Sequence, residues 1–308
     1  MNEEKKAKWI SGEIFQNDEY ANIFAKHRKY SVIKVLGNTC FLMKKPLVGI
    51  IKAKVYFSKG DVNEFIDECY KLSKEKNISY IEIHTSNADK AFLQFPKKLT
   101  GTYVIDLEQD IETIWENIDR SAKKKIKQAE KNNLKIEISE SETDFLEWWA
   151  LYINTGNRKK FNLDSLPLFR ELFENKKLSR LFIVKIDGKI VSGWFILLFE
   201  NGIISKLSGL NYEYSKYRTE DLLVWKLIQW AKMQGNSYFD MGGALPPRYD
   251  NNGVLINTGH GEGPSAFKKK FGGEYRDIYK YQLITNKIKY KMINAIIDVR
   301  FKLLKHLQ

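Results

Sequence analysis

The clearest pattern of apolar and polar positions lies in the last third of the chain. Apolar residues recur at the spacing of one helix side over residues 222–234, and they are Leu223, Val224, Leu227, Ile228, Trp230 and Ala231. A short apolar run over residues 237–241 then ends at Gly242 and Gly243. We therefore expect a helix, then a strand, and then two glycines that let the backbone approach a ligand closely.

The same alternation of helical and strand-like runs extends over the rest of the chain. Strands are predicted at residues 31–36, 39–43, 48–56, 80–84 and 103–107, with a helix at 61–76, and the pattern then recurs. Two hairpins are predicted at Asp187-Gly188 and Asn201-Gly202, because Asp-Gly and Asn-Gly favour tight turns. The pattern predicts an α/β (α+β) fold with two similar units, each with a mixed, mostly antiparallel sheet.

No Pro- or Ser-rich linker separates these units. The first alternation of strands and helices closes near residue 107, and we place the division there. The expected domains are residues 1–107 and 108–285, followed by a helical tail at 286–308. In this tail Met292, Ile296, Val299, Leu303 and Leu307 form one stripe, and six basic residues against one acid give a charge of +5. Such a basic amphipathic helix either docks on the body of the protein or lies on an anionic membrane surface.

The amino-acid composition limits the cellular compartments and binding partners that we expect for this protein. The net charge is +13, which indicates either many solvated lysines or an acidic partner such as nucleic acid, a nucleotide-linked sugar or an anionic membrane. Cys40 and Cys69 form no disulfide framework, and the four histidines form no metal motif, so we expect no metal. The N-terminus lacks the apolar run of a signal peptide, and the longest apolar run, 191–199, is too short to span a bilayer. These features favour a cytoplasmic protein.

Several motifs, in this order, resemble those of the FemABX family of aminoacyltransferases. They are a basic helix at 121–132 with the strand that follows it, Thr155-x-x-Arg158, Trp225-x-x-Ile228-x-Trp230-Ala231, Tyr238-Phe239-Asp240-Met241-Gly242-Gly243, and Phe267-Lys268-x-x-Phe271-Gly272. The first hundred residues match only loosely, through Phe15-Gln16 and Tyr20-Ala21. The resemblance implies two tandem domains of the GNAT acyltransferase type, of which the first is degenerate. The chain has no room for the coiled-coil arm of the longer family members, so it is similar to the short, armless type.

The resemblance also implies roles for individual residues. Lys268 matches the family lysine that stabilises the oxyanion during acyl transfer, and a cation is what such a transition state requires. For Lys269 and Lys270 we expect solvated side chains. Asp240 either holds the incoming amine or fixes the loop beside Gly242 and Gly243, and both roles stay open.

The remaining candidates are substrate-binding residues. Arg158 carries a planar guanidinium that suits phosphate or carboxylate, although a cation that stabilises the end of its helix is an equal alternative. Tyr217 matches a family tyrosine that lines the acceptor site. Lys123 belongs to the basic run 123–131, which is either a patch for tRNA or pyrophosphate or a solvated helix side. Gly242 and Gly243 are expected to border the bound substrate.

The lack of glycine in residues 214–220 bears on which acyl donor the protein uses. GNAT enzymes that use acyl-CoA hold its pyrophosphate in a glycine-rich loop before a helix, and here residues 214–220 contain no glycine. We therefore expect an aminoacyltransferase that moves an amino acid from aminoacyl-tRNA, its co-substrate, to an amine of a nucleotide- or lipid-linked muropeptide. No further cofactor is expected. The alternatives are a CoA-dependent N-acyltransferase of a surface polysaccharide or lipid sugar, and a non-catalytic nucleic-acid-binding protein.

Overall fold

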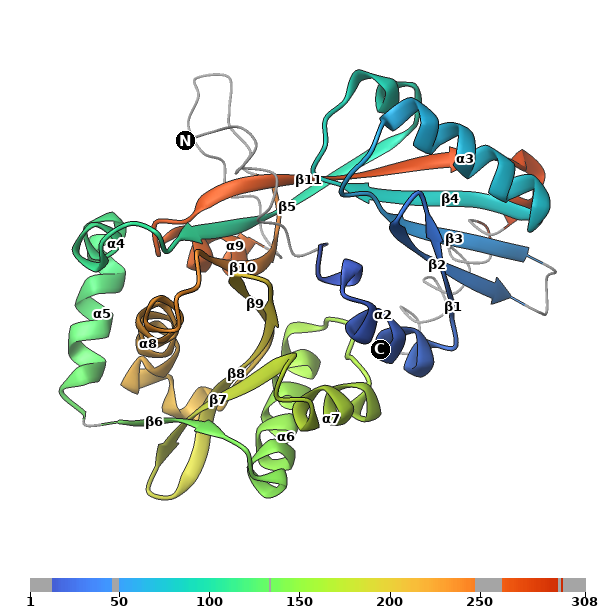
Figure 1. The fold of residues 1–308 in the computed structure, drawn as a ribbon. Helices are drawn as coiled ribbons and strands as arrows, with labels where there is room; N and C mark the ends of the chain where they lie inside the picture. The colour runs from blue at the N-terminus through green and yellow to red at the C-terminus, as the bar shows by residue number, and fades with distance from the viewer. Residues whose placement is uncertain (1–12, 46–49, 133, 247–261, 293–294, 296–308) are drawn as a thin grey trace. The chain divides into compact units, whose positions relative to one another are not determined.

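The structure, a computed structural model, describes residues 13–45, 50–132, 134–246, 262–292 and 295. The chain divides into two compact units (Figure 1). The central unit contains Thr100–Asp277, and the split unit contains Gly12–Leu99 together with the segment that starts at Ile278. The α/β class with mixed, mostly antiparallel strand pairing is confirmed.

The central unit is a sheet with helices on it. Its strands lie in the order β5 (Lys97–Asp106), β10 (Tyr238–Ala244), β9 (Gly202–Leu210), β8 (Lys189–Phe199), β7 (Ser179–Ile186) and β6 (Lys135–Ser139). All neighbours are antiparallel except β9 and β10, which are parallel because α8 (Thr219–Met233) connects them. The other elements are α4 (Ile111–Asn117), α5 (Arg120–Glu130), α6 (Glu142–Lys159), α7 (Leu166–Glu174), η4 (Tyr212–Tyr217) and α9 (Glu262–Lys269).

The split unit is built in the same sequence of steps. Its strands lie in the order β1 (Ser31–Val35), β2 (Asn38–Lys45), β3 (Ile50–Tyr56), β4 (Ile78–Thr85) and β11 (Glu274–Ile284). The parallel pair β3 and β4 is connected by α3 (Val62–Glu75), as β9 and β10 are by α8. The shorter elements are η1 (Glu13–Gln16), α2 (Asp18–Arg28) and η3 (Lys90–Gln94).

The two units exchange their last strands. Strand β5 follows β4 in the chain but pairs with β10, and β11 follows β10 but pairs with β4. The compact units divide at Leu99–Thr100 and again at Asp277–Ile278, a few residues before the boundaries expected near residue 107 and at residue 285. The sequence pattern missed this because it follows the order of strands along the chain, not their pairing. Most of the predicted tail lies outside the described residues; 287–292 are helical.

The core of the central unit explains why the predicted helix forms where it does. The apolar side of α8 packs into one cluster with Ala122, Ile126 and Ala129 of α5 and with Phe239 and Met241 of β10. On α6, Trp148 and Tyr152 are buried and stack at 6.2 Å between ring centroids. These contacts fix the ends of β9 and β10, where the candidate residues lie.

One predicted hairpin needs a correction. Asp187 and Gly188 form the tight turn between β7 and β8, both with positive φ angles. The next turn consists of Glu200 and Asn201, whereas Gly202 is the first residue of β9. A Cβ on Gly202 would lie 2.2 Å from the ring of Tyr238, so this glycine is required by packing against β10.

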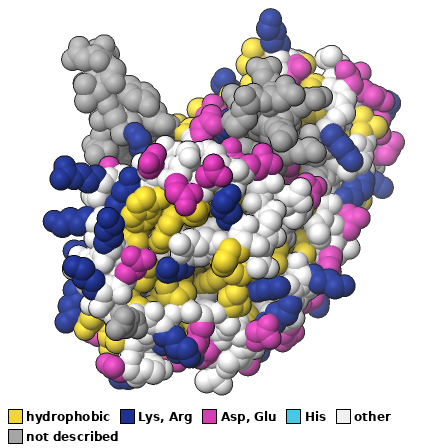
Figure 2. Space-filling model, turned by 60° about the vertical axis from the view of Figure 1, so that its left-hand side comes forward, with side chains coloured by type: hydrophobic (Ala, Val, Ile, Leu, Met, Phe, Trp, Pro, Cys, Tyr) yellow, Lys and Arg dark blue, Asp and Glu magenta, His cyan; other side chains and the backbone are white. Residues whose placement is uncertain are grey.

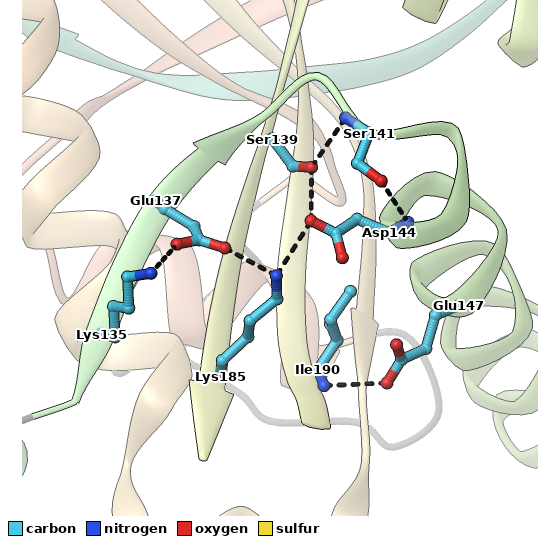
Figure 3. A network of polar contacts seen from close by, with 8 residues as sticks. All are labelled: Lys135, Glu137, Ser139, Ser141, Asp144, Glu147, Lys185 and Ile190. Atoms are coloured by element: carbon cyan, nitrogen blue, oxygen red, sulfur yellow. Dashed lines mark hydrogen bonds and ion pairs between the residues drawn. The ribbon is translucent and has the colours of Figure 1, made fainter. Parts of the chain in front are cut away.

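The edge strand β6 is tied to α6 by a polar network around Lys185 (Figure 3). Lys185 Nζ lies 2.7 Å from Glu137 Oε1 on β6 and 3.0 Å from Asp144 Oδ2 on α6. Ser139 donates to the same Asp144 oxygen at 2.7 Å. The lysine thus links two carboxylates from different elements. Hydrogen bonds from Lys135 and from Lys185 lower the pKa of Glu137, and those to Glu137 and Asp144 raise the pKa of Lys185.

Candidate active site

The ammonium group of Lys268 lies at the end of β10. It donates hydrogen bonds to the carbonyl oxygen of Gly242 at 2.9 Å and to that of Gly243 at 2.6 Å. Burial lowers the pKa of Lys268 to about 8, and the nearby Asp240 carboxylate opposes that shift. A half-buried ammonium whose pKa lies close to neutral pH is the type of group found at reaction centres.

Asp240 shapes the backbone on which Lys268 rests. Its side chain is 0% exposed, and its Oδ1 accepts from the backbone N–H of Gly242 at 2.7 Å and from the hydroxyl of Thr102. The ladder between β10 and β5 is irregular between Asp240 and Gly243, where these bonds replace regular pairing. Of the two roles left open for Asp240, this geometry favours fixing the loop, because a fully buried carboxylate does not meet an incoming amine.

Thr102 is a residue that sequence reasoning missed. Its hydroxyl lies on β5, contacts Asp240 and is 2.9 Å from the carbonyl oxygen of Gly242. It stands opposite Gly243 in the antiparallel pair, but 140 residues separate it from Gly242 in the sequence. Only the exchange of strands brings it to the site, so no local motif marks it.

The two glycines have different surroundings. Gly242 has a φ angle of +76°, and a Cβ there would lie 2.6 Å from the carbonyl oxygen of Ser205. Gly243 is exposed, and a Cβ there meets nothing within 4 Å. The backbone conformation and the close carbonyl oxygen therefore require glycine at position 242. Gly243, by contrast, borders open space beside the Lys268 ammonium.

Aromatic side chains anchor the segment that carries Lys268. The rings of Phe267 and Phe271 are 5.2 Å apart, and Phe271 is 0% exposed. Phe267 also lies 6.4 Å from the ring of Trp194 on β8. In addition, the backbone N–H of Leu245 donates to Ser265 Oγ at 2.9 Å, which ties α9 to the end of β10. The flanking phenylalanines of the motif thus hold the lysine in place.

Two acidic residues occupy the first turn of α8. The carboxylate of Glu220 accepts from the hydroxyl of Ser192 and from Trp194 Nε1, the latter at 3.1 Å, and the side chain of Asp221 is buried. Burial raises the pKa of both carboxyl groups. The sequence predicted these acids only as helix-starting residues. Their carboxyl groups occupy the N-terminal turn of α8, the part of a helix that can otherwise bind a phosphate.

Arg158 lines a cavity of about 330 Å³ between α6 and the end of β9. Its guanidinium lies 4.6 Å from the ring centre of Tyr212, and the lining residues are Leu151, Asn154, Arg158, Leu210, Asn211, Tyr212 and Glu213. Thr155 Oγ1 accepts from the backbone N–H of Leu210 at 3.1 Å, which fixes α6 against β9. The Thr155-x-x-Arg158 motif therefore combines one residue that positions the helix with one that faces a cavity.

The other predicted residues have more varied surroundings. Tyr217 is half-buried at the end of η4, with its ring 6.1 Å from that of Tyr214. Lys123 donates to the carbonyl oxygen of Glu116 at 2.9 Å and lies 5.9 Å from the ring of Trp115. Among the described residues, neither Tyr217 nor Lys123 forms a hydrogen bond, ion pair or ring contact with Lys268 or Arg158.

The three consecutive lysines at 268–270 also differ from one another in their exposure. Lys269 is exposed, as expected. The expectation of full solvation is wrong for Lys270, which is half-buried, and burial together with nearby Lys125 lowers its pKa.

The described residues hold neither a metal-ligand cluster nor a membrane-spanning helix. Within them, no group of three or more His, Cys, Asp or Glu side chains is arranged to hold a metal ion. None of the helices among them combines the length and the apolar character needed to cross a bilayer.

Comparisons with known proteins give the site a family context. Residues 117–253 match the model of a family described as "Acetyltransferase (GNAT) domain". None of the curated proteins matches this sequence. This family match includes Arg158, Tyr217, Asp240 and both glycines, and it ends before Lys268.

Solved structures of similar fold cover nearly the whole chain. FemX matches with a TM-score of 0.69 and 13% identity over 92% of this chain and 98% of its own. L-PGS from Bacillus licheniformis matches with a TM-score of 0.60 and 17% identity over 92% and 96%. The C-terminal domain of a putative lysylphosphatidylglycerol synthetase from Agrobacterium fabrum gives 0.59 and 13% over 96% and 92%. At these identities the likeness establishes the fold.

The fold, the GNAT match and the motifs agree with one another. The expected resemblance to FemABX enzymes is confirmed at the level of the fold. The alternative of a non-catalytic nucleic-acid-binding protein is thereby set aside. The chain is an acyltransferase: its residues 117–253 match the model of a GNAT acetyltransferase domain, and its fold is similar to that of FemX.

Proposed function

We propose that this acyltransferase moves an amino acid from aminoacyl-tRNA to an amine of a nucleotide- or lipid-linked cell-wall precursor peptide. The observation that carries the proposal is the Lys268 ammonium, held at the end of β10 by the carbonyl oxygens of Gly242 and Gly243. An ammonium group has three N–H bonds. Two are engaged by these carbonyls, and we assign the third to the oxyanion of the reacting ester.

The reaction joins the acceptor amine to the ester carbonyl carbon of the donor. A C–N bond forms, the bond from carbon to the ribose oxygen breaks, and the amine proton passes to the released ribose hydroxyl, directly or through water. Negative charge appears on the carbonyl oxygen in the transition state, so the Lys268 cation acts there. Asp240 and Thr102 serve as positioning residues, because they hold the backbone that orients the ammonium.

The choice of donor is supported by the first turn of α8. Glu220 and Asp221 place two buried carboxyl groups at the helix terminus that would otherwise attract a pyrophosphate. The loop before it, 214–217, is part of η4 and contains no glycine. These features favour a donor other than acyl-CoA.

The acceptor is proposed to bind through the Arg158 cavity. A guanidinium stacked on Tyr212 keeps its N–H groups free of the ring face and suits a phosphate or carboxylate of the precursor. Tyr217 and the open space beside Gly243 are proposed to line the rest of the acceptor path. Such an acceptor is made in the cytoplasm, so we place the protein there, at the inner face of the membrane when the precursor is lipid-linked.

The family match supplies a second candidate, because its description is that of an acetyltransferase. In that case the donor is acetyl-CoA and the acceptor an amino sugar of a surface polysaccharide or lipid. The likeness to L-PGS concerns the fold only and leaves both donors in play.

One experiment separates the two donors. The protein is incubated with candidate precursors and either charged total tRNA or acetyl-CoA, and the acceptor mass is read. A mass increase of one aminoacyl group with tRNA, lost in Lys268→Ala, supports the proposal. Acetylation, together with saturable CoA binding in calorimetry, supports the second candidate and refutes the first.

A further inference from the structure

Helix α5 presents a row of cations that the site described above does not use. Arg120, Lys124, Lys127 and, at the C-cap, Lys131 are exposed and recur at the spacing of one helix side. Successive members are about 4.5–6 Å apart along the axis, since each residue rises about 1.5 Å. The view in Figure 2 brings this side of the central unit forward, with Lys and Arg side chains gathered along it. We call these residues the α5 stripe.

The opposite side of α5 is already occupied. Its apolar residues Ala122, Ile126 and Ala129 are fully buried in the core that α8 shares. Glu130, an exposed acid of α5, lies 3.6 Å from Lys226, which offsets its charge. The α5 stripe therefore offers positive charge without an exposed large apolar side chain, which suits a polyanion better than a bilayer, where apolar side chains insert.

A pair of lysines continues from α5 toward the reaction centre. Lys125 of α5 and Lys270 are both half-buried, and burial together with the nearby charge of Lys125 lowers the pKa of Lys270. The backbone N–H of Asp119 donates to the carbonyl oxygen of Lys270 at 2.7 Å, which fixes the turn against α5. Neighbouring ammonium groups repel one another, and a phosphate between them would relieve that repulsion.

Acidic groups also face this pair. Asp221 of α8 and Asp119 at the N-cap of α5 both interact with Lys270, and Asp221 interacts with Lys125 and Arg218 as well. These two carboxylates offset part of the charge of Lys125, Lys270 and Arg218, so one net positive charge remains. The whole run, from Lys131 through Lys125 and Lys270 to Lys268, stays basic.

We propose that the acceptor arm of the donor tRNA docks on the α5 stripe and that its single-stranded 3′ end passes Lys125 and Lys270 to reach Lys268. This inference rests on the proposed function, because it gives the docking surface of that donor. Lys270 is only two positions from Lys268 in the chain, so a strand held at the first delivers its terminal ester to the second. The contacts are to phosphates, so the surface binds RNA by charge and shape.

The test uses an uncharged RNA hairpin with a single-stranded 3′ end, followed by fluorescence anisotropy at several salt concentrations. The variant is Lys124→Gln/Lys127→Gln/Lys131→Gln. The matched control is Lys71→Gln/Lys74→Gln/Lys76→Gln, which removes three exposed lysines at and beside the end of α3 in the split unit. We expect at least about a tenfold loss of affinity and a salt slope smaller by about 2–3 for the stripe variant alone.

A second probe locates the 3′ end. Lys270→Gln should weaken binding of the full hairpin and leave unchanged the binding of a hairpin that lacks the single-stranded nucleotides. Equal losses for the stripe and control variants would refute the α5 stripe. So would a stripe variant that loses affinity for anionic vesicles while its RNA affinity stays normal, since the surface would then serve a membrane.

The failure of this inference can be told from failure of the proposed function. Transfer from charged tRNA is measured in parallel. If the parent protein transfers the amino acid and the stripe variant keeps its KM for charged tRNA, the docking surface is wrong and the function stands. If no transfer occurs from tRNA, the function fails, and a stripe-specific loss of hairpin affinity still supports an RNA-binding surface.

Discussion

At the scale of single residues, the contacts of Lys268 define the sharpest expectation. Lys268→Ala should lower kcat by roughly 100- to 1000-fold, as loss of one oxyanion donor typically does, with little change in the acceptor KM. The physical reason is that the charge it stabilises exists only in the transition state. Steady-state kinetics at several acceptor concentrations measure both quantities.

Neighbouring lysines provide the controls for this change. Lys269→Ala should be nearly neutral because the side chain is exposed. Lys268→Arg keeps the charge but alters its shape, so partial activity is expected. A Lys268→Ala variant whose loss of rate matches a loss of thermal stability would show that the lysine only braces Gly242 and Gly243.

The same residue predicts an alkaline limit on the rate. The pKa of Lys268 is about 8, so the ammonium is present below that pH and is lost as pH rises through it. Turnover should therefore fall above about pH 8. In Lys268→Arg this limb should disappear, because a guanidinium stays charged to above about pH 12. A pH profile of kcat that is identical in both proteins would assign the limb to another group.

The adjacent glycines predict a contrast between two alanine variants. Gly242→Ala requires a positive φ angle and a 2.6 Å approach to the carbonyl oxygen of Ser205, so we expect a loss of about 1–3 kcal/mol in unfolding free energy. Gly243→Ala meets open space and should unfold like the parent protein. Urea denaturation of the two variants checks this, and equal stability would contradict the geometry.

A site residue could be predicted from the sequence when its contacts are local in the chain. Lys268, Arg158 and the glycines belong to short motifs, so local sequence was enough to single them out. Thr102 and the Glu220 contacts with β8 were missed because they join residues far apart in the chain. Lys270 was misjudged because its burial comes from packing against α5.

At the scale of elements, the network around Lys185 makes the edge strand β6 testable. Lys185→Met removes the cation that links Glu137 to Asp144, so we expect a loss of roughly 1 kcal/mol at neutral pH, in line with partly exposed ion pairs. Lys189→Met, at an exposed position at the start of β8, is the control. Unfolding in urea gives both values.

The pH dependence of that loss has a defined sign. The folded-state pKa of Glu137 is depressed, so its contribution is present above its ordinary pKa of 4.5 and is lost as pH falls through the lower folded value. The raised pKa of Lys185 means that its contribution lasts up to alkaline pH. The stability difference between Lys185→Met and its parent should therefore shrink below about pH 4. A constant difference would indicate lost packing instead.

Elements with strong periodicity were predicted well, and turns less so. The α8 helix was expected at residues 222–234 and spans Thr219–Met233, because one apolar side decides its position. The turn between β8 and β9 lies one residue earlier than expected, since Gly202 is fixed by the ring of Tyr238 from another strand. Local turn preference was overridden there by packing across the sheet.

At the scale of the whole molecule, the exchanged strands decide which fragment can fold. A fragment of residues 100–277 keeps β5 against β10 and therefore retains the Thr102 contact with Asp240. We expect it to unfold cooperatively in calorimetry. A fragment of residues 108–285, the domain that the sequence pattern suggested, leaves β10 without that neighbour and should show no cooperative transition. Equal behaviour of the two fragments would mean that β5 is dispensable.

The pairing of β11 with β4 also affects the order in which the two units can complete their folding during synthesis on the ribosome. Tyr281 and Leu283 of β11 belong to the core of the split unit, and the ring of Tyr281 stacks on Phe92 at 4.9 Å. Residues 12–99 emerge first, yet they lack this strand until the chain is almost finished, whereas domains generally fold in order of emergence. The first unit to be made is thus the last to be closed. Until then, we expect chaperones that bind nascent chains to bind the apolar side of its sheet.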